Sequence, residues 1–253
     1  MRVTFLGTGT SHGVPVIACQ CAVCRSDEPK NHRTRPSILL TLGDKHILVD
    51  TTPELRVQAL RHKVNRVDAI LFTHAHADHL HGLDDVRAYS AAQGRPITCY
   101  GSRATLERIL ITFSYAFELK HLGGGIPQIE LAPIDGVFSL FGTEIIPVDL
   151  LHGKTEVLGF RIGNFAYATD CNFIPPASLE MLKGLDVLVL DALRWSPPHP
   201  THFTIPEALE IVEYLQPKQT YFTHLTHDVE HHSTDAHLPK NVQLAYDGLI
   251  LDV

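Results

Sequence analysis

The sequence has neither a long hydrophobic run nor a run of basic residues. No apolar stretch approaches the ~18 residues that a membrane-spanning helix needs, so we expect no transmembrane segment. The first residues, MRVTFLGTGT, show no basic region followed by a long apolar one, which favours a cytoplasmic location. No Lys/Arg run exceeds a pair and the formal net charge is -7, so we do not expect nucleic acid as a partner. A small anionic substrate would therefore need local positive charge from a source such as a metal.

Cysteine is also scarce, with five residues in 253, whereas histidine is abundant, with 17. In a cytoplasmic protein, such cysteines are expected to be thiols or metal ligands and not a disulfide framework. Three of them, Cys19, Cys21 and Cys24, lie close together in the sequence. The length and the 44% hydrophobic content suffice for one large α/β domain, 1–253, with a substantial core. We therefore expect a single-domain protein that binds metal.

Nine short apolar runs have the length and composition of strands, and helical patterns lie between several of them. The clearest helix covers 204–216, where Thr204 and Glu207 form a capping box ahead of an apolar stripe. Residues 104–118 are a second helix candidate, and 121–127 (HLGGGIP) predict a flexible loop. This alternation indicates an α/β fold. The strand candidates are 3–6, 38–42, 46–49, 67–72, 144–148, 157–162, 165–168, 186–190 and 220–222.

Six of the predicted strands end on a side chain that can bind metal. In layered α/β folds, ligands bind beyond the carboxyl ends of the strands, where residues distant in sequence can converge. The pattern therefore predicts a polynuclear metal site at one edge of the fold. The six residues are Asp50, His74, His152, Asp170, Asp191 and His224.

The stretch FTHAHADHLHG places four histidines and an aspartate within 74–81, directly after a predicted strand. In an extended segment, His74 and His76 point to the same side and can hold one ion. Asp78 and His79 follow where the chain must turn into a helix, and from there they can reach a second ion. The alternative interpretation is a histidine-rich, solvated loop. The spacing favours two metals bound by one short segment.

These residues resemble the metallo-β-lactamase-fold hydrolases, whose signature HxHxDH matches 74–79, and whose further ligands follow in the motifs LLHG, ATD and FTH. The resemblance implies a four-layer αββα sandwich with two divalent metals at one edge. Manganese, zinc or iron would suit such a mixed His/Asp set. The resemblance also places Asp50 behind the ligands, where it orients a histidine. One metal would be held by His74, His76 and His152 and the other by Asp78, His79 and His224, with Asp170 bridging.

Three further motifs resemble the PhnP-like cyclic phosphodiesterase family, namely GTGTSHGVP, then CQCAVC, and finally HLTH. The family binds a separate structural zinc with three loop cysteines and a histidine, which in this sequence would be Cys19, Cys21, Cys24 and His227. Three thiolates and one imidazole complete a tetrahedron and leave no position for a substrate. The alternative is that the three cysteines are simply buried thiols. The resemblance thus implies a zinc-binding loop near 19–24.

The resemblance also predicts a histidine just before the capped helix that acts on the leaving group. His202 occupies that position, and His199 is the competing choice. The implied catalytic residues are therefore His202, Asp78 and Asp170. Residues 101–135 do not match the family pattern, which leaves the native substrate open.

The function implied by the resemblance is hydrolysis of small, cyclic phosphodiesters by a hydroxide that bridges the two metals. The transition state carries more negative charge than the substrate, so the metals favour it, and a protonated His202 would neutralise the departing alkoxide. One alternative is hydrolysis of another bond, such as a thioester, a lactone or an RNA phosphodiester in tRNA 3'-end processing. The tRNA-processing relatives use a long basic arm, and nothing in this sequence resembles one. The other is a metal-binding protein without catalysis. The resemblance also suggests a homodimer.

Overall fold

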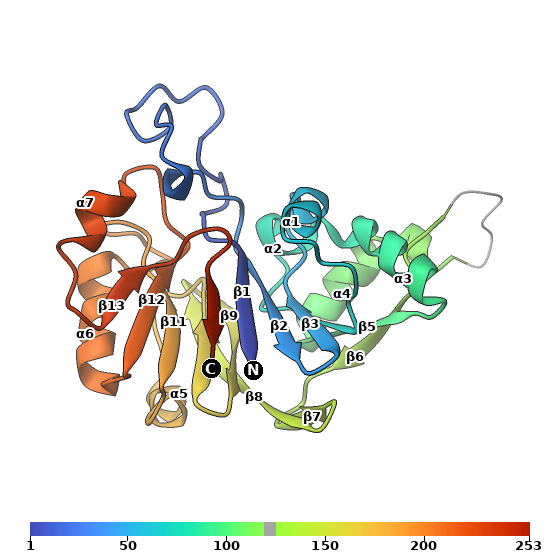
Figure 1. Cartoon of the computed structure of the whole chain (residues 1–253). Helices are drawn as coiled ribbons and strands as arrows, with labels where there is room; N and C mark the ends of the chain where they lie inside the picture. Colours follow the sequence, from blue (N-terminus) through green and yellow to red (C-terminus); the bar gives the residue numbers. More distant parts are fainter. Residues whose placement is uncertain (119–124) are drawn as a thin grey trace.

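The residues described by the computed structural model, 1–118 and 125–253, form two seven-stranded sheets (Figure 1). The first sheet has the order β14-β1-β2-β3-β4-β5-β6, in which β3 to β6 are parallel. Parallel neighbours need crossover connections, which the helices of this half supply. Its strands are β1 (Arg2–Gly7), β2 (Ser37–Leu42), β3 (Lys45–Val49), β4 (Ala69–Leu71), β5 (Ile97–Gly101), β6 (Ile129–Pro133) and β14 (Ile250–Asp252).

The second sheet has the order β13-β12-β11-β10-β9-β8-β7, and its strands β10 to β13 are parallel. Because β8 is antiparallel to β9, and β9 to β10, strand β8 also runs in the direction of the parallel set. The carboxyl ends of β8, β10, β11 and β12 therefore share one edge. The strands are β7 (Phe138–Leu140), β8 (Thr143–His152), β9 (Thr155–Ile162), β10 (Phe165–Ala168), β11 (Val187–Asp191), β12 (Gln219–Thr223) and β13 (Val242–Leu244).

Helices cover the outer face of each sheet (Figure 1). The first sheet carries α1 (Leu55–Arg61), α2 (Ala77–Leu80), α3 (Arg87–Gln93) and α4 (Arg103–Thr112). The second carries α5 (Pro176–Met181), α6 (Ile205–Leu215) and α7 (His231–Asp235). Short 3-10 helices occur at Pro29–Asn31, Leu83–Val86 and Ser114–Ala116. No helix of the described residues is long and apolar enough to cross a membrane.

Three hydrophobic clusters of the described residues separate these elements into four layers. The central cluster contains strand residues of both sheets, such as Ile38 and Tyr167, and no helix residue. The neighbouring residues on the same strands, such as Leu39 and Ala166, point outward and pack against the helices. The period-two alternation in the sequence thus builds an αββα sandwich, and the predicted fold class is confirmed.

The sequence identified the inner strands better than the edges. All nine predicted strands and the capped helix are confirmed, with the capping box formed by Thr204 and Glu207 at the start of α6. Strands β5, β6, β7, β13 and β14 were not predicted. The helix predicted over 104–118 ends earlier, because α4 stops at Thr112 and a 3-10 turn follows. The loop predicted at 121–127 lies largely outside the described residues.

A long connection, 8–36, joins β1 to β2 and contains all three clustered cysteines. In Figure 1 it is the blue loop that projects above the sheets, on the same side as α7. Residues Thr8 and Thr10 pair through their backbones with Leu225, just beyond β12. The loop is therefore attached to the edge at which the strands of the second sheet end.

Candidate metal centres

Seven histidines and aspartates converge at this edge from both sheets. His74 and His76 follow β4, Asp78 and His79 lie in α2, and His152 is the last residue of β8. Asp170 and His224 come two and one residues after β10 and β12. The donor atoms of each group lie within 4.8 Å of one another. The two groups are His74, His76 and His152, and Asp78, His79, Asp170 and His224.

Asp170 lies between the two groups. Its Oδ2 atom is 3.1 Å from Nε2 of His79 and 3.2 Å from Nε2 of His224. The same oxygen is 3.9 Å from Nε2 of His74, a member of the other group. Two ligand atoms bonded to one ion at ~2.0–2.1 Å are separated by about 3.4 Å in tetrahedral geometry. Asp170 is thus the residue whose position suits a ligand shared by two ions.

The backbone and side chains around the histidines fix which nitrogen faces the centre. Nδ1 of His79 is 2.7 Å from Oδ2 of Asp50, and Nδ1 of His152 is 2.8 Å from the carbonyl oxygen of Thr201. Each Nδ1 therefore donates a proton, so that Nε2 is the nitrogen of each ring that is left to bind a metal. These two contacts fix the orientation of the rings of His79 and His152.

The donor set fits divalent metal ions. Five buried atoms of the seven residues have no hydrogen-bond partner among the described residues, although buried polar atoms in folded proteins are almost always paired. One of the five is Nδ1 of His224, and a cation coordinated by the other four would satisfy all four. Mixed imidazole and carboxylate ligands suit zinc, manganese or iron. Those four atoms are Nε2 of His74, His79 and His224, and Oδ2 of Asp78.

The charges of the centre also favour a cation. Burial opposes the charged form of His79, yet the carboxylates of Asp170, Asp78 and Asp50 outweigh burial and hold its pKa well above the ordinary value. Burial would raise the pKa of Asp170, but His224 and His79 hold it well below the ordinary value. The centre thus stabilises positive charge, and a divalent cation supplies that charge directly.

Asp50 is fully buried and lies behind His79, one of the seven donors. In addition to His79, it accepts hydrogen bonds from the backbone N–H and the hydroxyl of Thr73, at 2.9 and 2.8 Å. Asp50, Asp170 and His224 all have left-handed backbones, with φ of 63°, 55° and 62°. Non-glycine residues rarely adopt this conformation, and such strain is concentrated at functional sites. The left-handed backbone at these three positions turns the side chains toward the centre.

His202 stands beside the donor set, whereas His199 lies one ring further away. The ring of His202 stacks on His224 at a centroid distance of 4.5 Å and lies 4.6 Å from His152. His199 is 5.1 Å from His202 and belongs to neither group of donors. Of the two candidates that the sequence left open, His202 is the one that contacts the donor set.

Asp191 is one of the six strand-end residues that the sequence pattern offered for the metal site, but in the structure it pairs with His202 and is not one of the seven donors. It is the last residue of β11 and is fully buried. Its Oδ2 atom is 2.7 Å from Nδ1 of His202 and accepts the backbone N–H of Cys171 at 2.9 Å. The pair fixes the tautomer of His202 and directs Nε2 away from Asp191. Its place at a strand end was visible in the sequence, but its partner was not.

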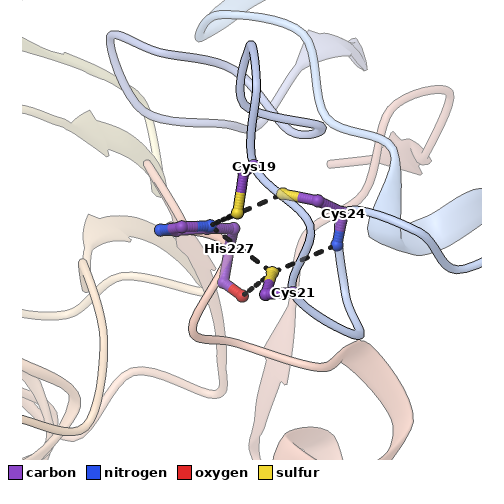
Figure 2. Close-up of side chains that lie close together, drawn as sticks. All are labelled: Cys19, Cys21, Cys24 and His227. Carbon is purple, nitrogen blue, oxygen red and sulfur yellow. Dashed lines mark hydrogen bonds between the residues drawn. The ribbon is translucent and has the colours of Figure 1, made fainter.

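The three cysteines and His227 meet at a second site (Figure 2). Nδ1 of His227 is 3.2 Å from Sγ of Cys19 and 3.5 Å from Sγ of both Cys21 and Cys24. A zinc ion bonded to sulfur at ~2.3 Å and to nitrogen at ~2.0 Å separates such atoms by about 3.5 Å. One ring nitrogen cannot form three hydrogen bonds to thiols. The four side chains therefore fit a tetrahedral zinc site better than a set of buried thiols.

The cysteine site is joined to the strand ends. His227 comes three residues after His224, and the buried Arg33 donates hydrogen bonds to the carbonyl oxygens of Thr226 and Val229, at 3.3 and 3.0 Å. The loop thus holds the backbone on both sides of His227. Displacement of the loop would be transmitted to His224 through only three residues.

Comparisons with known proteins agree with this geometry. A family model described as a beta-lactamase superfamily domain matches residues 45–225. A solved structure of a new diphosphatase from the PhnP family is 46% identical, with a TM-score of 0.93, and the match covers 99% of this chain and 97% of that chain.

Two relatives match a smaller part of their own length. An octanoyltransferase of Porphyromonas gingivalis is 35% identical over an alignment of 253 residues. The match covers 98% of this chain and 51% of that protein. A ribonuclease Z of Staphylococcus epidermidis is 27% identical over 73% of this chain and 55% of that protein. The chain thus spans about half the length of these two relatives. From the superfamily model and the full-length PhnP-family match, the chain belongs to the beta-lactamase superfamily and is a PhnP-like member of it.

Proposed function

We propose that this chain is a metal-dependent hydrolase of small phosphodiesters, cyclic ones included. The observation that carries the proposal is the convergence of seven metal-type donors next to His202, whose ring lies against His152 and His224 and whose Nδ1 is held by Asp191. A hydrolytic site needs a means of activating water and a group that can protonate a leaving oxygen. The donor set and His202, which lie next to each other, would supply the two.

Two divalent cations, when bound, supply a nucleophile at neutral pH and positive charge for a phosphoryl group. The residues of the chain orient that chemistry. Asp50 and Thr201 hold the rings of His79 and His152, and Asp170 sets the spacing between the two groups of donors. Nε2 of His202 would hold the proton that the departing oxygen takes up, which would contribute about 10²- to 10⁴-fold in rate.

Small substrates suit the space beside His202. A cavity of about 390 Å³ opens there, which is the lower end of the range for small-molecule sites. The phosphodiester is a monoanion whose transition state carries additional negative charge, so a cationic centre favours it differentially. The similarity to a PhnP-family diphosphatase supports a reaction at phosphorus.

Hydrolysis of a phosphoanhydride is a second candidate, favoured by the name of that PhnP-family structure. A thioester, a lactone or a tRNA 3' end are the weaker alternatives on the same fold. Acyl transfer, named for the Porphyromonas gingivalis relative, gains no support because about half of that protein lies outside the match. The three cysteines and His227 would hold a structural zinc, separate from the reaction.

The test is turnover of a substrate panel by the purified, metal-loaded protein. The panel contains bis(p-nitrophenyl) phosphate, a cyclic phosphodiester, a diphosphate ester, a thioester and a lactone, each assayed beside metal analysis. We expect hydrolysis of the phosphodiesters, its loss on chelation, and its return with added Mn²⁺ or Zn²⁺. Turnover of the thioester or the lactone in the absence of phosphodiester turnover would overturn the proposal.

A further inference from the structure

Two segments that carry residues of the site meet beside the donor set. His152 ends β8 at the turn into β9, and His202 ends a proline-rich segment, 196–202, that lies between β11 and α6. The ring centroids of the two histidines are 4.6 Å apart. The placement of His202 relative to the donor set therefore depends on how the turn after β8 and the proline-rich segment are held together.

The proline-rich segment has few backbone donors of its own. Three of its seven residues are prolines, which carry no backbone N–H. Donors outside the segment bind its carbonyl oxygens instead. Nε of Arg194 donates to the carbonyl oxygen of Pro197 at 3.0 Å, and Nδ1 of His152 donates to that of Thr201 at 2.8 Å. Side chains of other segments thus determine where this one lies.

The side chain of Asn172 contacts both segments at once. Its Oδ1 atom accepts the backbone N–H of Gly153 at 2.7 Å, and its Nδ2 atom donates to the carbonyl oxygen of Pro200 at 3.1 Å. A backbone N–H only donates and a carbonyl oxygen only accepts, so the two partners fix the orientation of the amide. An ionised carboxylate in this place could form only the first of the two bonds.

The surroundings of Asn172 leave little freedom to this bridge. The backbone N–H of Asn172 donates to the carbonyl oxygen of Leu151 at 2.9 Å, which attaches the residue to the end of β8. Gly153 has a left-handed backbone, with φ of 64°, and a Cβ atom there would lie 2.9 Å from Cγ2 of Thr201. The turn and the proline-rich segment are therefore in close contact, and the amide of Asn172 joins them across that contact.

We infer that Asn172 is a positioning residue that sets the place of His202 relative to His152. The inference rests on the proposed function. In that reaction an oxygen from water bonds to phosphorus, the bond from phosphorus to the leaving oxygen breaks, and the leaving oxygen takes a proton from His202, which regains one from solvent. Proton transfer needs heavy atoms within hydrogen-bond reach, and a displacement of about 1 Å can cost about 10²-fold in rate. Asn172 exchanges no proton and acts through His202.

The test uses Asn172→Asp and Asn172→Leu in the metal-loaded protein. Asn172→Asp keeps an acceptor for Gly153 but cannot donate to Pro200, and Asn172→Leu, of similar size and without charge, forms neither bond. The matched control is Asn241→Asp, because Nδ2 of Asn241 also donates to a proline carbonyl, that of Pro217, at 3.5 Å. These two control residues precede β13 and β12, at the sheet edge opposite the site.

The first measurement compares two leaving groups. With glycerol 1,2-cyclic phosphate, whose leaving group is an alkoxide, both Asn172 variants should lose about 10- to 100-fold in kcat. With bis(p-nitrophenyl) phosphate, whose leaving group needs little protonation, the loss should be about threefold or less. In a protein that already carries His202→Ala, the Asn172 substitutions should cost little more with either diester. The metal content should equal that of wild type.

The second measurement does not depend on turnover. Hydrogen–deuterium exchange, followed by mass spectrometry, reports the opening of the backbone at 196–203. Both Asn172 variants should exchange this segment about 3- to 10-fold faster than wild type, the equivalent of one lost hydrogen bond. Asn241→Asp should leave exchange of the segment and both turnover rates unchanged.

Equal losses with the two diesters, full additivity with His202→Ala, or loss of metal would overturn the inference, because each would assign Asn172 to the fold or to His152. A loss in Asn172→Asp that Asn172→Leu does not share would overturn it as well, since the added charge would then be the cause. If wild type hydrolyses neither diester, the proposed function fails and exchange decides the positioning alone. Faster exchange in both variants would support it, and unchanged exchange would reject it.

Discussion

The two candidate metal centres are built in opposite ways. The donors of the first are carried by strand ends and a short helix of the two sheets, and most of them are buried. Three of the four ligands of the second lie in the loop 8–36, whose buried apolar side chains are Val14, Val23 and Cys24. The first centre is therefore positioned by the hydrophobic core. The second would help to order the loop that carries it, so that metal binding and local structure would depend on each other.

This difference predicts that damage to the first centre removes activity and leaves the fold, which Asp170→Ala tests. Asp170 is the donor closest to both groups, and two-metal sites supply several kcal/mol to the transition state. We expect kcat/KM for a phosphodiester to fall by more than about 10³-fold, with a far-ultraviolet spectrum like that of wild type. The control is Asp149→Ala, an exposed carboxylate on β8. Wild-type turnover by Asp170→Ala would contradict the shared-ligand position.

The loss in kcat on replacement of His202 should depend on the leaving group. With a poorly acidic alcohol, His202→Ala should lose about 10²- to 10⁴-fold in kcat, because the departing oxygen needs a proton. With p-nitrophenolate, which needs little protonation, the loss should shrink to about tenfold or less. Asp191→Asn should follow the same dependence more weakly, since Asp191 only orients the ring. His199→Ala is the matched control. Equal losses with both leaving groups would mean that His202 positions the substrate instead.

The donors of the first centre could be proposed from the sequence because each of them is marked by the residues next to it. Each donor follows an apolar run, and parallel strands bring their carboxyl ends together, so Asp50, His74 and Asp170 could be placed without knowledge of the packing. Strand β6 was missed because it lies at a sheet edge, where few of its residues are buried and the apolar pattern is weak. Strand β13, at the edge of the other sheet, has only three residues, too few to show a pattern. The sequence could predict what each strand ends on, but not what the sheet edges look like.

Contacts between distant loops could not be predicted for a different reason. Arg33 has 1% of its surface exposed and the side chain of Asp247 is 4% exposed, although charged residues are usually on the surface. Their partners lie about 190 to 240 residues away along the chain. The periodic pattern of apolar residues in the sequence does not indicate which distant residues will pair. The attachment of the cysteine loop therefore became visible only in the structure.

The second centre should show the reverse response, with loss of stability before loss of activity. Cys21→Ser should lower the zinc content by about one per chain, reduce the melting temperature by several degrees and leave the other metals bound. Turnover should fall only about tenfold, through the three residues that join His227 to His224. Ile17→Ser, at the most exposed apolar residue of the same loop, is the control. Full zinc content and stability in Cys21→Ser would contradict the proposed structural role of the second centre. Loss of the other metals alone would contradict its separation from the first centre.

The base of the same loop is held without metal, by Asp247. One of its carboxylate oxygens accepts the hydroxyl of Thr8 at 2.8 Å, and the other accepts the backbone N–H and the hydroxyl of Thr34 at 2.8 and 2.7 Å. Thr8 and Thr34 lie near the two ends of the loop, so this carboxyl joins them. Burial raises the pKa of Asp247 to about 6, although these hydrogen bonds and Arg61 oppose the rise.

The loop base should have the smallest effect on turnover, which we expect to stay unchanged, and a pH dependence of stability instead. A carboxyl whose pKa is raised on folding binds its proton more tightly in the folded state. Its contribution is greatest below about pH 4 and is lost as the pH rises through about 6. Across that range, the unfolding free energy of wild type minus that of Asp247→Asn should fall by about 3 kcal/mol. The subtraction cancels the titration of the metal ligands, and urea unfolding at intervals of one pH unit measures it. A free-energy difference that stays constant with pH would mean that Asp247 has the same pKa in the folded and unfolded chains. Its contribution to stability at the loop base would then resemble that of a surface carboxylate.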